Sequence, residues 1–204
     1  MRSSPAHSCA MIATLRGCLL AVAFVATAAG APSRIAAQEM DVPVAIQIPL
    51  FLKVMTFDRQ LTTRAEGELV VAIAYQSGHR ASRSTKDEVA RALAVVDQNS
   101  SGVRIRAVVI DLDNEVLGDA LKRERVLVLY VAPLRGSDIA LIAGAARSAG
   151  VTTVTGVSAY VALGLAVSVR LQADKPKLLI NLTQAKKEGA EFSSELLKLV
   201  QVSR

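Results

Sequence analysis

The fold of this 204-residue chain is predicted from residues 175–200, which read KPKLLINLTQAKKEGAEFSSELLKLV. The apolar run Leu178–Ile180 is short and follows a proline, so it suits a buried strand better than a helix. After Asn181 the apolar residues fall at helical spacing as far as Val200, which predicts two short helices. Ser193 or Ser194 is placed to cap the second of them. A strand followed by helices of this kind indicates a sheet that helices cover.

Upstream of this stretch, apolar strands alternate with helices. We expect strands at Glu68–Tyr75, Arg104–Ile110, Val126–Val131 and Val151–Thr155. The helices expected between them open at Thr85, with Val89, Leu93 and Val96 on one face, at Asp113 or Asn114, and at Ile139, the last one stopping at Gly150. Because β-α-β connections are right-handed, these four strands should form a parallel sheet.

Both ends of this alternating region depart from it. Val42–Phe57 is almost wholly apolar and predicts a helix, which Pro43 opens and Pro49 kinks or restarts. Gly164–Gln172 and Lys177–Asn181 are joined by the turn sequence Ala173–Pro176, which predicts an antiparallel hairpin on the sheet edge. The expected fold class is α/β: a single three-layer Rossmann-like domain, with a mostly parallel sheet and a C-terminal antiparallel hairpin.

Residues 1–37 have the pattern of a secretory signal. Arg2 and Arg16 precede an apolar run, Leu19–Ala29, that is too short to span a bilayer, and small residues follow it. We expect cleavage after Ala37, which leaves one domain over residues 38–204. Cleavage near Ala29, a start of translation at Met11 and a retained membrane anchor are the alternatives. The predicted localisation is periplasmic, with no membrane span in the mature chain.

Composition narrows the function further. The chain is 51% hydrophobic but only 3% aromatic, an aliphatic balance that fits a sheet buried on both faces. Without the signal, the charge falls from +6 to +3 and no basic block remains, so nucleic-acid binding has little support. Both cysteines, Cys9 and Cys18, leave with the signal. The mature protein therefore has no disulfide, no thiolate metal site and no cysteine nucleophile.

Polar residues follow the ends of the predicted parallel strands. The carboxyl ends of such strands lie at one edge of a sheet, where α/β domains bind ligands. This geometry predicts a ligand or partner region formed by Gln76, Ser77, His79, Asp111, Ser137, Thr155 and Ser158.

No motif in this region predicts catalysis. Asp111, Asp113 and Glu115 could hold a hard cation, but the spacing lacks the glycine of a calcium loop. A helix start at Gly136–Asp138 could meet a phosphate, although a plain N-cap is the simpler interpretation. His79, the sole histidine after residue 37, has no nucleophile elbow to serve. We expect no enzyme activity, no metal and no cofactor.

The C-terminal stretch also resembles a known family. The order Lys177-Leu-Leu-Ile-Asn181, then Ala185, Gly189 and Ser193-Ser194 before Leu197-Lys198-Leu199, is similar to the C-terminal signature of the YfiR/HmsC-like family of bacterial periplasmic regulatory proteins. The resemblance implies a YfiR-like α/β domain with an N-terminal helix on the sheet. Members often end that helix with an aromatic pair or Trp-Pro, whereas this chain has Thr56-Phe57-Asp58.

The resemblance implies that the protein works by binding. YfiR-like proteins bind the periplasmic part of an inner-membrane diguanylate cyclase and hold it inactive, which lowers cyclic-di-GMP and biofilm formation. The expected partner is such a cyclase or a sensor kinase. The alternative is a periplasmic small-molecule binding protein. The first helix is expected either to be a buried packing helix or to expose an apolar surface for a partner, and that surface could equally serve a homodimer.

Overall fold

The computed structural model describes residues 40–96, 104–198 and 200–203. The predicted secretory signal lies outside these residues and stays a prediction. The helices are α1 (Val44–Met55), α2 (Leu61–Ala65), α3 (Arg80–Val95), α4 (Leu117–Arg123), α5 (Ile139–Ala149), α6 (Ala159–Ala162), α7 (Leu182–Lys187) and α8 (Ser194–Leu197). The strands are β1 (Glu68–Tyr75), β2 (Arg104–Asp111), β3 (Val128–Val131), β4 (Thr152–Thr155), β5 (Val167–Gln172), β6 (Lys175–Asn181) and β7 (Gln201–Ser203).

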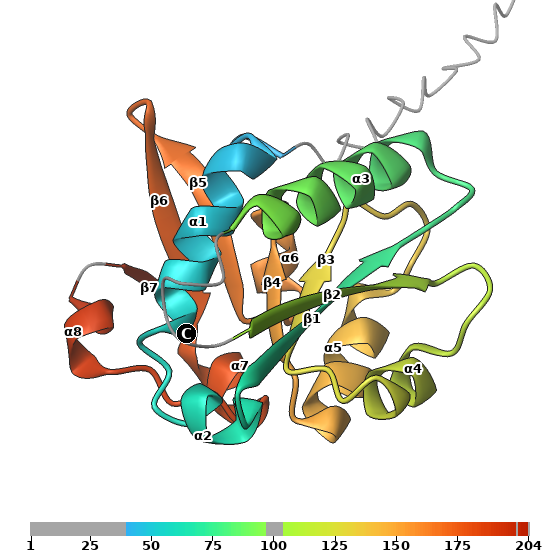
Figure 1. Cartoon of the computed structure of the whole chain (residues 1–204). Coiled ribbons are helices and arrows are strands. Elements are labelled where there is room, and N and C mark those ends of the chain that lie inside the picture. The colour runs from blue at the N-terminus through green and yellow to red at the C-terminus, as the bar shows by residue number, and fades with distance from the viewer. Residues whose placement is uncertain (1–39, 97–103, 199, 204) are drawn as a thin grey trace, which may run out of the picture. The chain divides into compact units, whose positions relative to one another are not determined.

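The described strands form one sheet in the order β2-β1-β3-β4-β5-β6-β7. All neighbours are parallel except β5 and β6, which form the antiparallel hairpin. The hairpin extends beyond the rest of the sheet in Figure 1. The predicted α/β class, parallel sheet and hairpin are therefore confirmed.

Helices cover both faces of the sheet, which makes three layers. Figure 1 shows α1 and α3 on one side and α4 and α5 on the other. Successive residues of a strand point to opposite faces, so Tyr130 packs with α1 while its neighbour Leu129 packs with α4 and α5. Both residues are fully buried. The near-continuous apolar strands of the sequence thus supply two separate cores.

The predicted loop after β1 is shorter than expected. A polar sequence up to Ser84 suggested a loop, but α3 begins at Arg80, five residues before the predicted opening at Thr85. The reason is that Ser82 faces inward, where its hydroxyl accepts a hydrogen bond from the amide of Gln76. A polar residue with such a buried partner fits the packed face of a helix.

The C-terminus differs most from the prediction. The last helix, α8, ends at Leu197 instead of continuing to Val200, and the chain then adds β7 parallel to β6. The hairpin therefore does not lie at the edge of the sheet, because β7 is the outermost strand on that side. β6 also begins earlier than expected and includes Pro176.

Two helices of the structure begin with a side-chain cap, and two others do not. Asp138 caps α5 by accepting from the Ala140 amide at 2.8 Å, and Asn181 caps α7 by accepting from the Gln184 amide at 3.0 Å. The prediction that Asp113 or Asn114 caps the next helix is wrong, because α4 begins only at Leu117. Asp113 instead accepts from the Gly78 amide, and Asn114 donates to Asp111. Ser193 occupies the N-cap position of α8 but makes no capping hydrogen bond.

The N-terminal helix is continuous through Pro49. One side of α1 packs on the sheet through Ile48, Phe51 and Val54, all buried. The other side exposes Ile46, whose relative exposure is 44%. The expectation of a buried packing helix is therefore confirmed on one side, while an apolar surface for a partner stays a prediction.

Candidate functional site

Four of the predicted site residues gather at the carboxyl edge of the sheet. Gln76 joins the loop after β1 to the loop after β3, because its side chain accepts from the Arg135 amide at 2.7 Å and donates to the Arg135 carbonyl at 3.2 Å. His79 Nδ1 lies 3.2 Å from the carbonyl oxygen of Pro133 in the same loop. Asp111 accepts from the Ser77 amide, so these four of the seven predicted residues form one local surface.

Two carboxylates organise this surface. Asp111 accepts from the amides of Ser77 and Asp113, both at 3.1 Å, and from the Asn114 side chain. Asp113 accepts from the Gly78 amide at 2.7 Å and from the Ser77 hydroxyl at 3.2 Å. Burial alone would raise the pKa of Asp111, but the bonds from Ser77 and Asn114 outweigh it and hold that pKa below the usual value. These carboxylates tie two loops together.

The remaining predicted residues form no hydrogen bond with this network in the described part of the chain. Thr155 is fully buried, and its hydroxyl donates to the Val131 carbonyl at 2.9 Å and accepts from the Val157 amide at 3.1 Å. Its side chain is therefore buried and does not reach the surface. Ser158 is half-buried at the start of α6, and Ser137 is half-buried one residue before the Asp138 cap.

Sequence reasoning missed a buried polar contact between α1 and β3. Gln47 of α1 is fully buried, and its amide accepts from the Tyr130 hydroxyl at 2.9 Å while donating to the Val42 carbonyl. Burial raises the pKa of Tyr130, so the hydroxyl stays protonated and donates this bond. Met40 completes the group, with its sulfur 3.5 Å from the Tyr130 hydroxyl. A glutamine in a helix whose one other polar side chain is Lys53 was the available signal.

A buried carboxylate, Glu188, was also missed. It follows α7, has no exposed surface and accepts from the amide and hydroxyl of Thr153 at 2.8 and 2.9 Å, and from Gln184 at 3.0 Å. Burial raises its pKa to about 7, even though these hydrogen bonds and the nearby Arg147 act in the opposite direction. In the sequence Glu188 sits in a polar run and gave no signal.

An apolar groove lies on the surface beside α1. It lies between α1 and α3 and has a volume of about 500 Å³. Its lining comprises Val44, Ala45, Pro49, Glu88, Arg91, Ala92, Val95 and Val96. Val95 is 83% exposed, so the apolar surface continues outward from the groove. The two charged side chains in its lining carry opposite signs.

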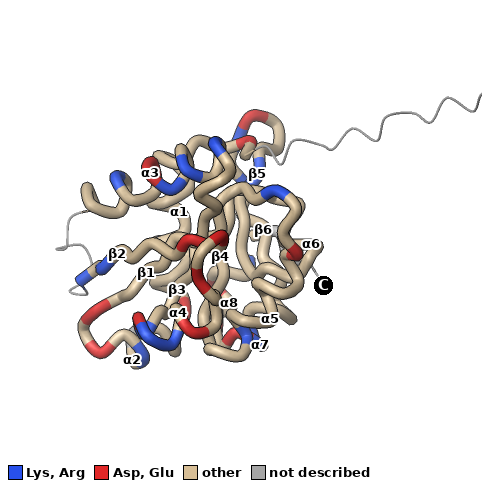
Figure 2. Tube along the Cα trace, turned by 90° about the vertical axis from the view of Figure 1, so that its right-hand side faces the viewer, with Lys and Arg blue, Asp and Glu red and all other residues tan. Residues whose placement is uncertain are grey.

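The described residues form neither a block of like charge nor a cluster of metal-binding side chains. Figure 2 shows lysines and arginines interspersed with acidic residues along the trace. Among residues 40–96, 104–198 and 200–203, no three His, Cys, Asp or Glu side chains are grouped so that they could hold a metal ion. Glu115, the third member of the acidic series, pairs instead with Arg123 at 2.8 Å. No helix in these ranges has the length and hydropathy needed to cross a membrane.

The fold is shared with larger solved proteins. A domain in complex with L-Trp from Streptococcus pneumonia matches with a TM-score of 0.56 and 15% identity, over 79% of this chain and 62% of that one. A conserved domain protein from Vibrio cholerae matches with a TM-score of 0.54 and 13% identity, over 79% and 60%. This chain thus spans about six-tenths of the length of either. At such identities the likeness shows an α/β fold of this class alone.

Family membership rests on the sequence profile. The YfiR/HmsC-like family matches residues 70–201, which include every strand from β2 to β6 and most of β1. This chain belongs to the YfiR/HmsC-like family, as its C-terminal stretch indicated. No curated protein matches it.

Proposed function

We propose that this chain is a non-catalytic periplasmic regulator, which binds the periplasmic part of an inner-membrane signalling protein and modulates it. The family supports a regulator in cyclic-di-GMP signalling, and thus an effect on biofilm formation. A diguanylate cyclase is the first candidate partner and a sensor kinase the second. The predicted secretory signal supports a periplasmic location.

The observation that carries this proposal is the apolar groove between α1 and α3. Its wall residues Val44, Ala92 and Val95 are aliphatic, and Glu88 and Arg91 offer one charge of each sign. An amphipathic helix can lie in such a groove with its apolar side inward and its own charges over this pair. The partner that fits this groove is an amphipathic helical segment next to a membrane span.

The proposal is tested by using the protein as bait on solubilised inner membrane of the native cell. We expect it to retain a membrane protein with a periplasmic region and a cyclase or kinase domain. Val95→Asp should weaken retention about tenfold, because burying a valine contributes about 1.5 kcal/mol and a buried aspartate is unpaired. Leu141→Asp is the control, since Leu141 is 72% exposed on α5. Equal retention by both variants would contradict the proposal.

The second candidate is a periplasmic small-molecule binding protein. It is favoured by the polar loops at the carboxyl edge and by the solved domain whose complex holds L-Trp. Against it, Gln76, Asp111 and Asp113 already bond to neighbouring loops. A rise in melting temperature with L-tryptophan or a metabolite extract, together with no retained membrane protein, would favour this candidate.

A further inference from the structure

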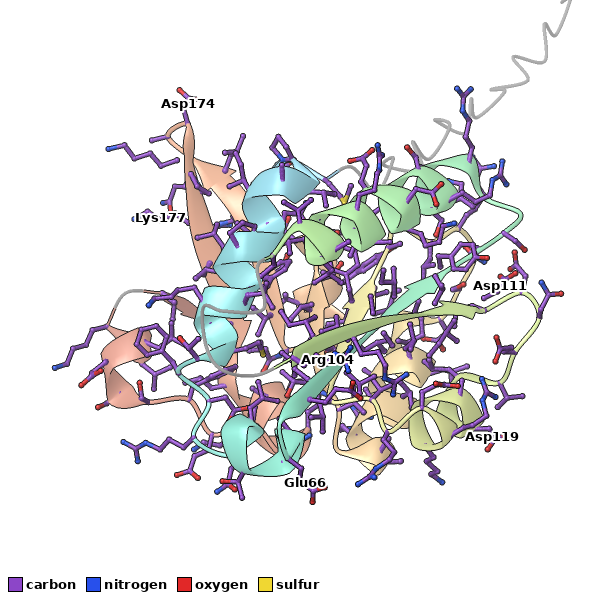
Figure 3. All side chains as sticks on the ribbon, in the orientation of Figure 1. Glu66, Arg104, Asp111, Asp119, Asp174 and Lys177 are labelled. Carbon is purple, nitrogen blue, oxygen red and sulfur yellow. The ribbon has the colours of Figure 1, made fainter. Side chains whose placement is uncertain are left out.

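Two carboxylates are buried in the described part of the chain, those of Glu188 and Asp58. A buried carboxylate is rare without partners, because removing a charge from water is costly. Other carboxylates point outward, as those of Glu66 and Asp174 do in Figure 3. Glu188 begins the segment 188–193 after α7, here called the α7 turn, and Asp58 bonds to this segment. Both buried carboxylates therefore belong to one junction.

Glu188 fastens the α7 turn to the sheet. One of its oxygens accepts from the Thr153 amide at 2.8 Å, and the other accepts from the Thr153 hydroxyl at 2.9 Å and from Gln184 at 3.0 Å. The Thr153 hydroxyl in turn accepts from the amide of Ala166, just before β5, at 2.7 Å. The Gln184 side chain also accepts from Arg147 of α5 at 3.1 Å. One carboxylate thus joins the end of α7 to β4, and through its partners to β5 and α5.

The other contacts of the α7 turn hold the loop that follows α1. The Glu191 amide donates to the Asp58 carboxylate at 2.9 Å, and the Ser193 amide donates to the Phe57 carbonyl at 3.0 Å. Because α1 ends at Met55, these bonds lie directly after it. The α7 turn therefore connects the sheet to the C-terminal end of α1.

Glu188 is placed so that its charge can change near neutral pH. Burial favours the neutral acid and raises the pKa of Glu188 to about 7, although the three donors and the positive charge of Arg147 favour the ionised form. The parts of β4 and β5 that it meets, Thr153 and Ala166, are uncharged. The other charged groups on the surrounding elements are Arg64 of α2, which bonds to the Gly150 and Gly189 carbonyls, Asp58, Glu191, and the exposed Lys186 and Lys187. A rise in pH through about 7 therefore creates a charge inside the protein, beside β4.

We propose that Glu188 is a proton-dependent latch for the α7 turn. When Glu188 is protonated, it stays buried against Thr153 and the turn is closed. When it is ionised, it favours an open state in which its carboxylate reaches water, because the closed state keeps the charge buried. α7 buries only Gln184 and Ala185, so little apolar surface opposes a local opening. The latch therefore opens by local unfolding of α7 and its turn, while the parallel strands stay paired.

The latch also acts on α1. Opening of the α7 turn breaks its bonds to Asp58 and Phe57, so the loop after α1 loses these partners. α1 forms one wall of the apolar groove. An effect of pH on a partner in that groove rests on the proposed function. The latch itself concerns this chain alone, so its test needs no partner and can fail or succeed independently of the proposed function.

Native-state hydrogen exchange tests the latch, with protection factors that remove the intrinsic effect of pH on exchange. The protection of amides in α7 and its turn should fall about 25-fold between about pH 5.5 and about pH 8, since the pKa of Glu188 is about 7 when closed and 4.5 in water. These amides should also be less protected than those of β3 and less sensitive to urea, because the opening is local. Protection equal to that of β3, or protection that does not change with pH, overturns the latch.

Three variants identify the titrating group. Glu188→Gln carries no charge at any pH and should abolish the fall in protection. Glu195→Gln, the matched control, removes an exposed carboxylate on α8 and should leave the fall unchanged. Arg147→Met keeps Glu188 but removes the positive charge that favours its ionised form, so the fall should extend to higher pH; this variant serves even if Glu188→Gln does not fold. A fall that persists in Glu188→Gln, or that Arg147→Met leaves at the same pH, overturns the proposal.

Discussion

Gly156 follows the end of β4, where Met40 and Gln47 of the N-terminal segment pack closely against it. A β-carbon at this position would come within 2.5 Å of the Gln47 amide and 2.7 Å of the Met40 sulfur. Gln47 cannot swing aside freely, because it is buried and bonded to Tyr130. A glycine is therefore required for close approach of two segments, and α1 is held at its N-terminal end by this contact.

We expect Gly156→Ala to destabilise the protein by about 1–3 kcal/mol, since the new methyl group must break the Gln47–Tyr130 bond or displace Met40. The matched control is Gly118→Ala in α4, where a β-carbon meets nothing within 4 Å and alanine should stabilise the helix by about 0.5–1 kcal/mol. Urea unfolding measures both. Similar effects of the two substitutions would contradict the close approach.

Glu188 makes stability depend on pH. Its pKa is raised to about 7 by burial, so the folded protein binds this proton more tightly than the unfolded chain does. The free energy of unfolding should therefore fall as pH rises from about 4.5 to about 7, by an amount on the order of 2–3 kcal/mol. Glu188→Gln cannot titrate and should flatten this slope in urea titrations between pH 5 and 7.5. An equal slope in the variant would show that another group titrates.

At the scale of elements, the short C-terminal helices depend on their first residues. α7 has six residues and α8 has four, too few to be stable alone. Asn181 caps α7 through a side-chain bond, whereas Ser193 at the same position of α8 makes none and its buried hydroxyl has no hydrogen-bond partner among the described residues. The N-cap side chains of α7 and α8 should therefore contribute differently to the stability of the protein.

Asn181→Ala should lower the free energy of unfolding by about 1 kcal/mol, the usual contribution of a capping side chain. Ser193→Ala should change it by less than about 0.5 kcal/mol, because no capping bond is lost. Thermal melting of both variants under one condition is the measurement. If the serine substitution costs as much as the asparagine substitution, the hydroxyl does cap α8.

At the scale of the whole molecule, α1 is part of the fold although the family match begins only at residue 70. It supplies Ile48, Phe51 and Val54 to the core on one face of the sheet, and the Phe51 ring lies 6.2 Å from that of Tyr130. Without α1, the part of this sheet face that contains Val71 and Val154 would be exposed to water. The domain therefore requires residues before the matched segment.

A chain that begins at Gln60 should fail to unfold cooperatively, whereas one that begins at Gln38 should show a single transition. In the intact chain, Phe51→Ala should cost about 3–5 kcal/mol, because it leaves a cavity between α1 and the sheet. Near-UV circular dichroism and urea unfolding measure these effects. A cooperative transition in the shorter chain would show that α1 is dispensable.

Periodicity predicted the local elements well, because strand and helix patterns reflect which faces are buried. The four parallel strands, the hairpin and α5 were found this way, with boundaries shifted by a few residues. Helix starts were less predictable. Ser82 and Asp113 are residue types that also occur in loops and caps. Their roles depend on tertiary contacts, Ser82 with the Gln76 amide and Asp113 with the Gly78 amide of another loop, which the local pattern does not show.

The sequence by itself determined the α/β class, the mostly parallel sheet, the family and the gathering of Gln76, Ser77, His79 and Asp111, since all of these follow from residue order and strand direction. Only the tertiary structure decided that Thr155 is buried, that Gln47 reaches Tyr130 and that Glu188 lies beneath Thr153. Such features depend on packing between segments far apart in the chain, which local patterns do not encode.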